Sequence, residues 1–459
     1  MKTPQPPTTS PSPATGPFRR RDFLKTAAAG AGLLILPSGA FAGPNAPSNK
    51  LNVALIGADG RGRAHYEALA TENVVALCDV DETHLDFAQQ TFPDAKRYID
   101  WRECLDHPEL DAIVCCTTDQ THAFISSWAL DRDLHIYCEK PLAISVEEAR
   151  LVRAKYLPKK DKLATQVGMQ RHAKENFNRI REMILDGAIG ELREVSAWGD
   201  RQIPRDGYLP AAGDPPKHLH YDLWLGPAPF HPYNPGYFKG DTGMNCLEWN
   251  MFWDFGVGQV GDMGSHTMDI VWNAIDATLP ISAEGVGEPF NPEVTPVRMT
   301  STFVNPANDW RPEIVVKWYQ GGDMPASPEK YIDLNAIGHG AMFRGTHGYL
   351  IANFDTRILY PYGAKTDMTY YKPRAEKDLL PEVGHFQKQW INACKGGSLK
   401  TACDFEYSAN MIEQLILGLV AYRHGGKIEY DGAAGRVTNS ESANALLKRP
   451  YRDGWTLEG

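Results

Sequence analysis

The sequence has no excess of positive charge. Its 459 residues include 47 lysines and arginines against 57 aspartates and glutamates, which gives a formal net charge of −10 at pH 7. A surface with this balance repels polyanions, so neither nucleic acid nor an anionic membrane is expected as a partner. Beyond residue 42 the chain also lacks a run of roughly 20 uninterrupted apolar residues, so we expect no membrane span in the mature protein.

The sequence also lacks cysteine spacings that hold metals. Its eight cysteines include no C-x-x-C pair and no zinc-type spacing. Cys78, Cys115, Cys116 and Cys138 lie inside apolar runs, where cysteine behaves as a small buried hydrophobic side chain. We therefore expect no metal site, and we do not expect these four cysteines to form disulfides.

The N-terminal residues differ from the rest of the chain. A Pro-, Ser- and Thr-rich leader ends in an arginine pair followed by Asp-Phe-Leu-Lys, and a mildly apolar run leads to Ala40-Phe41-Ala42. These features are typical of a twin-arginine signal and of its cleavage site. We expect 1–42 to be this signal peptide and 43–50 a linker, with export of the folded protein by the twin-arginine machinery to the periplasm or another extracytoplasmic space. An ordinary basic secretion signal or a membrane anchor is the alternative.

A short apolar segment followed by glycines begins the folded part of the chain. Leu51–Ile56 predicts a strand buried in a parallel sheet, and the turn Gly57-Ala58-Asp59-Gly60-Arg61-Gly62 leads to a helix expected to begin near Arg63. Such a turn directs backbone N–H groups at one point, where a pyrophosphate binds. Asp59 replaces the middle glycine of the G-x-G-x-x-G pattern, so the turn alone is equally compatible with a turn that binds nothing.

A second strand supports nucleotide binding. Asn73–Cys78 is apolar and runs into Asp79, 22 positions after Gly57. A carboxylate at this distance hydrogen-bonds the ribose hydroxyls in dinucleotide folds. Because Asp79 would repel a 2′-phosphate and no arginine follows it, we expect NAD in preference to NADP.

The order of predicted elements indicates two domains. Strands alternate with helices over 51–170, which predicts a Rossmann domain with a doubly wound parallel sheet. Over 171–459 a region rich in Pro, Gly, Trp and Tyr at 200–260 precedes strands in series. We expect those strands at 297–304, 313–318, 348–353 and 358–360, and helices at 385–393 and 405–422. This pattern predicts a C-terminal α/β domain with an open, mostly antiparallel sheet.

Two short motifs carry acid–base side chains. Glu139-Lys140-Pro141 follows the predicted fifth strand, at the sheet edge where doubly wound folds bind ligands. In Gly261–Asp269, Asp262 and His266 lie four positions apart and would share one helix face, where a carboxylate could orient the histidine. The alternatives are a surface turn for the first motif, and a helix cap with a satisfied histidine or a metal site for the second.

These features together resemble the glucose–fructose oxidoreductase / inositol dehydrogenase family (Gfo/Idh/MocA). The resemblance implies that Lys140 and His266 form the catalytic pair and that Asp262 helps to hold the substrate. The cofactor-binding residues that it implies are Gly57, Asp59, Gly60, Arg61, Gly62, Asp79, Thr117, Gln120, His122, Glu139 and Lys140. Asp59 departs from the family's glycine pattern, and Gly60 and Gly62 could compensate. The resemblance also implies a homo-oligomer assembled through the open sheet.

The substrate is expected to contact the aromatic region at 200–260. Tyr221, Trp224 and Trp249 could stack on sugar faces, and Asp269 could accept hydrogen bonds from hydroxyls. The aromatic residues are as compatible with a subunit interface. We therefore expect an exported NAD-dependent oxidoreductase that acts on a sugar, sugar derivative or cyclitol and recycles a tightly bound cofactor. The alternatives are a glycoside hydrolase or lyase that works by transient oxidation and elimination, and a non-catalytic carbohydrate-binding protein.

Overall fold

The computed structural model describes residues 49–240, 244–329, 332–362, 371–396 and 398–458. Residues 50–459 form one unit, and all that follows concerns this unit. The predicted signal peptide at 1–42 and residues 43–48 of the predicted linker lie outside the described residues.

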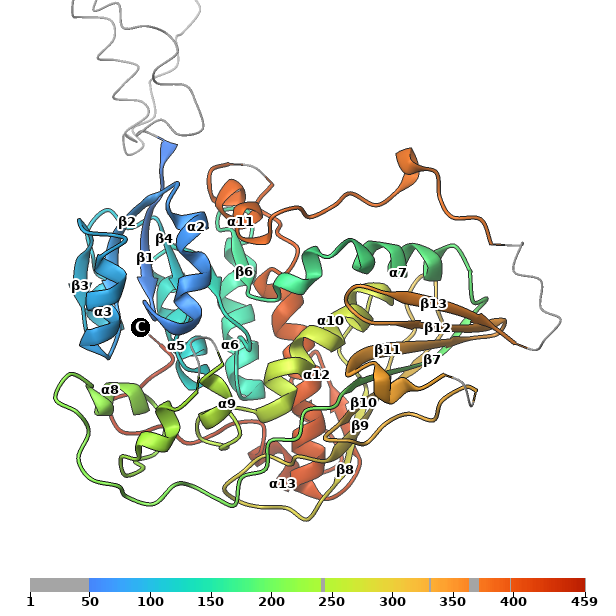
Figure 1. Ribbon diagram of the computed structural model, residues 1–459. Coiled ribbons are helices and arrows are strands. Elements are labelled where there is room, and N and C mark those ends of the chain that lie inside the picture. The colour runs from blue at the N-terminus through green and yellow to red at the C-terminus, as the bar shows by residue number, and fades with distance from the viewer. Residues whose placement is uncertain (1–48, 241–243, 330–331, 363–370, 397, 459) are drawn as a thin grey trace, which may run out of the picture. The chain divides into compact units, whose positions relative to one another are not determined.

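The N-terminal half of this unit is built on a parallel six-stranded sheet (Figure 1). Its strands are β1 (Asn52–Ile56), β2 (Asn73–Cys78), β3 (Lys96–Tyr98), β4 (Ala112–Cys115), β5 (His135–Cys138) and β6 (Thr165–Val167). Their order is β3-β2-β1-β4-β5-β6, and every neighbouring pair is parallel. The order reverses between β1 and β4, where such folds open a crevice for ligands. The predicted Rossmann sheet is confirmed.

The helices between these strands follow the expected alternation. They are α2 (Tyr66–Leu69), α3 (Glu82–Gln89), α4 (Trp101–Cys104), α5 (Asp119–Asp131) and α6 (Val146–Tyr156). The prediction for the first helix was wrong in its start and type. A 3-10 helix at Gly60–His65 precedes α2, because the Asp59 side chain accepts from the Gly60 N–H and so caps the first turn.

A nine-stranded sheet forms the C-terminal half. Its strands are β7 (Leu192–Gly199), β8 (Ser282–Gly287), β9 (Met299–Asn305), β10 (Ile314–Gln320), β11 (His339–Gly345), β12 (Gly348–Ala352), β13 (Arg357–Pro361), β14 (Ile428–Asp431) and β15 (Arg436–Val437). Only β7 and β10 pair in parallel, and the other neighbours are antiparallel. The predicted mostly antiparallel sheet is confirmed. The strands β8, β11, β14 and β15 were not predicted, and of these β8 and β11 contain glycines and alternate weakly.

Helices cover one face of this second sheet and join it to the first. These are α7 (Glu175–Leu185), α10 (Ser265–Ala274) and α12 (Phe405–His424), and in the chain α11 (Phe386–Cys394) precedes α12 and α13 (Glu441–Ala445) follows it. α10 contacts β7 and β11, and α12 contacts β8, β9 and also α6 of the first half. One continuous hydrophobic core therefore spans both halves, as Figure 1 shows for the helices between the sheets. In the described part of the chain, no helix is long and apolar enough to cross a bilayer.

The region at 200–260 reaches back to the first sheet. It contains α8 (Tyr221–Leu225), a 3-10 turn at Pro235–Phe238 and α9 (Cys246–Trp249). The His220 N–H donates to the Val80 carbonyl at 2.8 Å, and the Glu82 N–H donates to the His218 carbonyl at 2.9 Å. These bonds attach the region to the turn after β2, beside Asp79, so it covers the predicted nucleotide site.

Candidate active site

Three glycines shape the turn after β1, and each is required for a different steric reason. Gly57 has a φ of +83°, and a Cβ there would lie 2.5 Å from the Cys116 carbonyl oxygen. A Cβ on Gly62 would lie 2.2 Å from the Gly57 carbonyl, so the helix packs closely on the turn. Gly60 has a φ of +57° and lines the cavity beyond the turn. Gly60 therefore supplies the open backbone that the middle glycine of the pattern would provide.

The Asp59 carboxylate is bound by partners within the glycine turn and the helix that follows it. It accepts from the Gly60 N–H and forms an ion pair with Arg63, one turn further along the helix. Burial alone would raise the pKa of Asp59, but Arg63 and the Gly60 N–H lower it. The charge of this replacement residue is thus compensated inside the turn.

Asp79 lies at the end of β2 where the ribose carboxylate was predicted. Its Oδ2 accepts from the Ala58 N–H at 2.9 Å, and its Oδ1 accepts from the Asp81 N–H at 3.0 Å. The ring of His84 lies 3.2 Å from the same Oδ1. Burial opposes protonation of His84, but the hydrogen bond to Asp79 and the charges of Asp79 and Asp81 raise its pKa to about 9. The carboxylate is therefore held in place by both backbone and side chain.

Glu139 is the centre of a buried ion cluster. Its Oε1 lies 2.9 Å from Arg61 Nε and 3.0 Å from His65 Nε2. Burial alone would raise the pKa of Glu139, but Arg61 and His65 lower it to about 2. Glu139 thus joins the end of β5 to the first helix, and both Glu139 and Arg61 line the cavity.

Lys140 and Asp262 meet across the two halves of the chain. Lys140 Nζ lies 2.6 Å from Asp262 Oδ1, and Asp262 Oδ2 also accepts from Arg201. Burial opposes the charge of Lys140, but Asp262 raises its pKa, so the ammonium persists at neutral pH. Burial likewise opposes the charge of Asp262, but Lys140 and Arg201 lower its pKa to about 2.

His266 faces the same cavity as a neutral imidazole. A π-helical turn at Val260–Gly264 leads into α10, and Asp262 and His266 both line the cavity. The carboxylate does not orient the imidazole as predicted, because it binds Lys140 and Arg201. Burial, followed by the charges of Lys140 and Arg171, lowers the pKa of His266 to about 3. The buried Nδ1 of His266 has no hydrogen-bond partner among the described residues.

His122 connects the turns after β4 and β5. Its Nδ1 lies 2.7 Å from the Pro141 carbonyl oxygen and its Nε2 lies 3.0 Å from the Thr117 carbonyl oxygen. Two carbonyl acceptors require the ring to donate from both nitrogens. Burial opposes this charge, but Cys115, Asp119 and the two carbonyls raise the pKa of His122. His122 thereby positions the peptide that carries Lys140.

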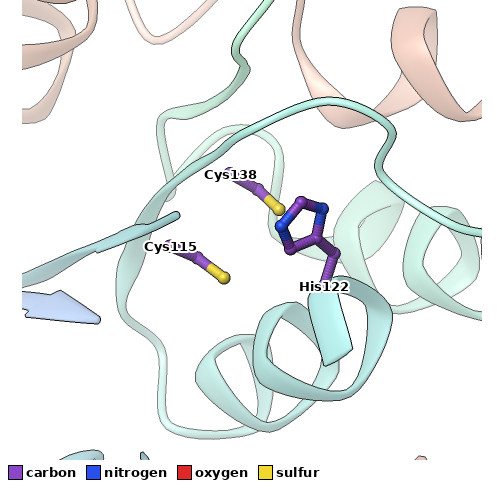
Figure 2. A group of neighbouring side chains, drawn as sticks. All are labelled: Cys115, His122 and Cys138. Carbon is purple, nitrogen blue, oxygen red and sulfur yellow. The ribbon is translucent and has the colours of Figure 1, made fainter. Parts of the chain in front are cut away.

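The same histidine belongs to a group that has the composition of a metal site. Figure 2 shows the sulfurs of Cys115 and Cys138 beside the His122 ring, and their ligand atoms lie within 4.8 Å of one another. A histidine binds metal through a ring nitrogen that carries no proton. Because both ring nitrogens of His122 donate to carbonyls, the group offers only two sulfurs.

A cavity of about 290 Å³ joins these groups. Of the predicted residues, those that line it are Gly57, Asp59, Gly60, Arg61, Asp79, Thr117, His122, Glu139, Lys140, Trp224, Trp249, Asp262 and His266. Gly62, Gln120, Tyr221 and Asp269 do not line it. The three predicted catalytic residues and most of the predicted nucleotide residues are therefore brought to one cavity from both halves of the chain.

The residues that do not line the cavity have other partners. The Gln120 amide donates to the Trp224 carbonyl at 3.0 Å, which anchors α8. The Tyr221 hydroxyl donates to the His231 carbonyl at 3.0 Å, and its ring packs in an aromatic cluster. Asp269 binds His172, 2.9 Å from its Nδ1, and accepts from the Tyr407 hydroxyl. Their hydrogen bonds hold the protein together around the cavity.

Five charged residues in the cavity were missed by the sequence analysis. Arg171 and Arg201 follow β6 and β7, Asp81 caps α3, and His84 and Asp119 lie on the first turns of α3 and α5. Burial raises the pKa of Asp119 to about 7, although His122 and Lys140 oppose the rise. The signal that could have found Arg171 and Asp119 is their position directly after predicted strands, at the sheet edge already assigned to ligands.

The groups around the cavity fit an extended dinucleotide. The turn at Gly57–Gly62 can approach a pyrophosphate closely, since two of its glycines leave no room for a Cβ. Asp79 lies at the end of the neighbouring strand for the ribose, and Lys140 and His266 lie at the other side of the crevice. The cavity is thus continuous from the predicted ribose site to the predicted acid–base groups.

Two family models match the chain. One, described as "Oxidoreductase family, NAD-binding Rossmann fold" (GFO_IDH_MocA), matches residues 51–168. The other, described as "Oxidoreductase family, C-terminal alpha/beta domain" (GFO_IDH_MocA_C2), matches residues 209–296. The two matches contain the glycine turn, Asp79, Lys140, Asp262 and His266 in the expected order.

Known proteins are similar to this chain at two levels. Inositol 2-dehydrogenase/D-chiro-inositol 3-dehydrogenase of Lacticaseibacillus casei is 33% identical over 152 residues, which are 32% of this chain and 44% of the relative. The chain thus spans less than half the length of that curated relative. The WlbA dehydrogenase of Chromobacterium violaceum, solved with NADH and UDP-GlcNAcA, superposes with a TM-score of 0.59 at 15% identity, over 87% of this chain and 99% of that one.

A second solved structure has the same fold. The aldose–aldose oxidoreductase of Caulobacter crescentus, complexed with glycerol, superposes with a TM-score of 0.51 at 12% identity, over 83% of this chain and 100% of that one. At these identities the two solved structures establish a shared fold.

Proposed function

We propose that this chain, which belongs to the Gfo/Idh/MocA oxidoreductase family, oxidises a hydroxyl group of a sugar, sugar derivative or cyclitol with NAD. The observation that carries the proposal is the meeting of Lys140, Asp262 and His266 in the cavity that also contains the glycine turn and Asp79. The inositol dehydrogenase relative supports the substrate class.

NAD is the cofactor that these residues suit. When bound, it accepts a hydride at nicotinamide C4. Asp79 would bind the ribose hydroxyls and repel a 2′-phosphate, and the turn at Gly57–Gly62 would hold the pyrophosphate. Preference for NAD over NADP is part of the proposal.

Lys140 and His266 divide the proton chemistry between them. Lys140 stays protonated beside Asp262, so it donates a hydrogen bond to the reacting hydroxyl oxygen and stabilises the developing carbonyl. Neutral His266 accepts the hydroxyl proton as the hydride leaves the same carbon. Asp262 holds the Lys140 ammonium in place and is itself kept charged by Arg201.

A panel of sugars and cyclitols tests this proposal. Purified protein is incubated with NAD and each compound, and NADH formation is followed by its absorbance. His266→Asn and Lys140→Met should each bind NADH normally and lose at least about 10²-fold in turnover, the usual contribution of a positioned acid or base. Unchanged turnover in both variants would remove the acid–base assignment.

A second function is favoured by Asp119. This carboxyl group lies in the same cavity, and its pKa of about 7 suits a group that gives or takes a proton at neutral pH. Simple hydroxyl oxidation already has a base in His266. An additional acid suits elimination: oxidation of one sugar carbon acidifies its neighbour, the glycosidic bond breaks, and the hydride returns. Mass spectrometry of glycoside digests would separate the two functions, because elimination releases the aglycone without accumulating NADH.

We also propose export by the twin-arginine route, with NAD loaded before export and retained afterwards. The arginine pair at Arg20-Arg21 supports export. The cover that 218–220 forms over the turn beside Asp79 supports retention, because such a cover slows dissociation. Little free NAD exists outside the cytoplasmic membrane, so the cofactor would be recycled on the enzyme.

Two experiments test export and retention separately. Arg20→Lys with Arg21→Lys should leave the protein in the cytoplasmic fraction, whereas unchanged fractionation would refute the twin-arginine route. Protein that is dialysed extensively and then denatured should release NAD(H) in near-equimolar amount. Substoichiometric nucleotide, with activity that depends on added NAD, would refute retention.

A homo-oligomer in solution completes the proposal, and light scattering of the purified protein tests it.

A further inference from the structure

Two arginines lie at the end of the cavity that contains His266. Arg171 is in the 3-10 turn Gln170–Ala173 directly after β6, and Arg201 lies two residues after the end of β7. Both line the cavity with Lys140 and His266. Nothing in the sequence indicates that the two arginines are close in space, because they follow strands of two different sheets.

The two arginines differ in their partners. Arg201 binds the Asp262 carboxylate, which Lys140 also binds. The Arg171 guanidinium has no ion pair or side-chain hydrogen bond within the described ranges. It lies over the ring of Phe354, with its carbon 4.2 Å from the ring centroid. The Phe354 ring in turn packs edge-on against His266 at 6.5 Å. Arg171 is thus held beside the acid–base groups with its donors unused.

Positive charge exceeds negative charge at this end of the cavity. Lys140, Arg171 and Arg201 are cations, His266 is neutral, and Asp262 is the carboxylate between two of them. Even with Asp119 ionised, the cations that line this end of the cavity outnumber the carboxylates that line it by one. Asp355 lies outside the lining and pairs with Lys174. Burial and the charge of Arg201 lower the pKa of Arg171, although Asp262 and Asp355 oppose the fall. A half-buried cation in this position is stabilised by an anion.

The pyrophosphate of a dinucleotide is too far away to be that anion. It would lie at the turn after β1, whereas Arg171 follows β6, three strands away in the order β1-β4-β5-β6. Adjacent strands are about 4.8 Å apart, so roughly 14 Å separates the two positions. An anion that binds Arg171 would therefore come from the substrate.

We propose that the substrate carries a negatively charged group, a carboxylate or a phosphate ester on a sugar, which Arg171 and Arg201 bind next to the carbon that is oxidised. This inference rests on the proposed function and specifies its substrate class. Arginine suits the role because its planar array of donors matches carboxylate and phosphate oxygens.

The proposed anion would also prepare the base. Arg171 is one of the charges that depress the basicity of His266. An anion that binds Arg171 offsets this charge and makes His266 a stronger proton acceptor. The acidic substrate would therefore gain in turnover as well as in affinity over its neutral counterpart.

Matched sugars test the proposal. The full-length purified protein is saturated with NADH, and binding is measured by calorimetry for glucose, galactose and mannose, each as the neutral hexose, the hexuronate and the 6-phosphate. At least one acidic form should bind at least tenfold more tightly than its neutral counterpart. Preference for the hexuronate identifies a carboxylate, and preference for the phosphate identifies a phosphate ester.

Two variants show whether Arg171 is responsible. Arg171→Gln should reduce the preference for the acidic form at least tenfold. Arg193→Gln is the control. It removes an exposed arginine of β7 that pairs with Glu191 outside the cavity, and it should leave the preference unchanged. The inference would be overturned if none of the three hexoses showed a preference for an acidic form, or if the preference survived Arg171→Gln.

The NADH titration separates this inference from the proposed function. Protein that fails to bind NADH refutes the proposed function itself. Protein that binds NADH and accepts neutral sugars as tightly as acidic ones refutes only the anionic substrate.

Discussion

The buried pair of Lys140 and Asp262 allows a quantitative test of the site's architecture. Asp262 has two cationic partners, Lys140 and Arg201, whereas Lys140 forms its ion pair with Asp262, at 2.6 Å. Asp262→Asn would leave two cations without a carboxylate. Lys140→Met would leave Asp262 still paired with Arg201. We therefore expect the aspartate variant to lose more stability than the lysine variant.

The magnitude follows from the pKa of Asp262. This pKa falls from its ordinary 3.8 to about 2 in the folded protein. At about 1.4 kcal/mol per pKa unit, the folded state favours the charged carboxylate by about 2 kcal/mol. Because the folded pKa lies below the unfolded one, this stabilisation is present above about pH 4 and is lost as the pH falls through about 2. Measurements at pH 7 therefore detect all of it.

Urea denaturation of a double-mutant cycle measures the effect. We expect Asp262→Asn to lower the free energy of unfolding by about 2 kcal/mol and Lys140→Met by about 1 kcal/mol. The double variant should lose less than the sum, with a coupling of about 1–2 kcal/mol. The exposed pair of Arg97 and Asp86, 2.7 Å apart, provides a control cycle, with an expected coupling below about 1 kcal/mol.

The result that would refute this reasoning is additivity. If the losses of the two variants at Lys140 and Asp262 sum to within about 0.5 kcal/mol, the ion pair makes no net contribution. A larger loss for Lys140→Met than for Asp262→Asn would also contradict the role assigned to Arg201 as the second partner.

Three further predictions concern the glycine turn, Asp79 and His266. Asp79→Ala should weaken NAD binding by about 1–3 kcal/mol in calorimetry, while Asp86→Ala on the exposed side of α3 should not. Gly57→Ala should lower the melting temperature more than Gly213→Ala, because both have positive φ but only the Cβ at Gly57 would meet backbone, at 2.5 Å. The pKa of His266 is about 3 in the folded protein and 6.5 ordinarily, so the unfolded chain takes up the proton first. Between pH 7 and pH 5 the wild type should therefore lose about 2 kcal/mol more stability than His266→Asn.

Each of these has a clear contrary outcome. Equal affinity of the wild type for NAD and NADP would refute the role of Asp79 in cofactor choice. Equal melting temperatures for the two alanine variants would show that the turn after β1 adjusts to a side chain. A pH dependence of stability that is the same with and without His266 would show that this histidine is not buried as a neutral base.

The first sheet could be predicted because its signals are local. Consecutive residues were enough to recognise the strand Asn52–Ile56 with its glycine turn and the strand Asn73–Cys78 with Asp79. Both strands are largely buried, as their apolar sequences predict. A segment buried on both faces reads as apolar, and a turn that passes close to backbone requires glycine. The strands β8 and β11 were missed because the glycines in them weaken that pattern.

The helix around Asp262 and His266 shows the limit of spacing arguments. The spacing of four positions predicted that both side chains share one helix face, and the structure shows that both line the same cavity. The spacing was not enough to predict the partner of the carboxylate. Asp262 binds Lys140, 122 positions earlier in the chain, and this pairing left His266 Nδ1 without a hydrogen-bond partner in the part of the chain that the structure describes.

The sequence by itself predicted the nucleotide fold and the two motifs with acid–base side chains, and it indicated the family, because apolar strands, glycine turns and short motifs can each be recognised in consecutive residues. The tertiary structure decided the charge of the cavity. Lys140, Arg171 and Arg201 come from the ends of β5, β6 and β7, in two different sheets, and Asp262 from the turn before α10. Electrostatic interaction depends on distance in space and on burial, and neither is specified until the two halves pack around one core.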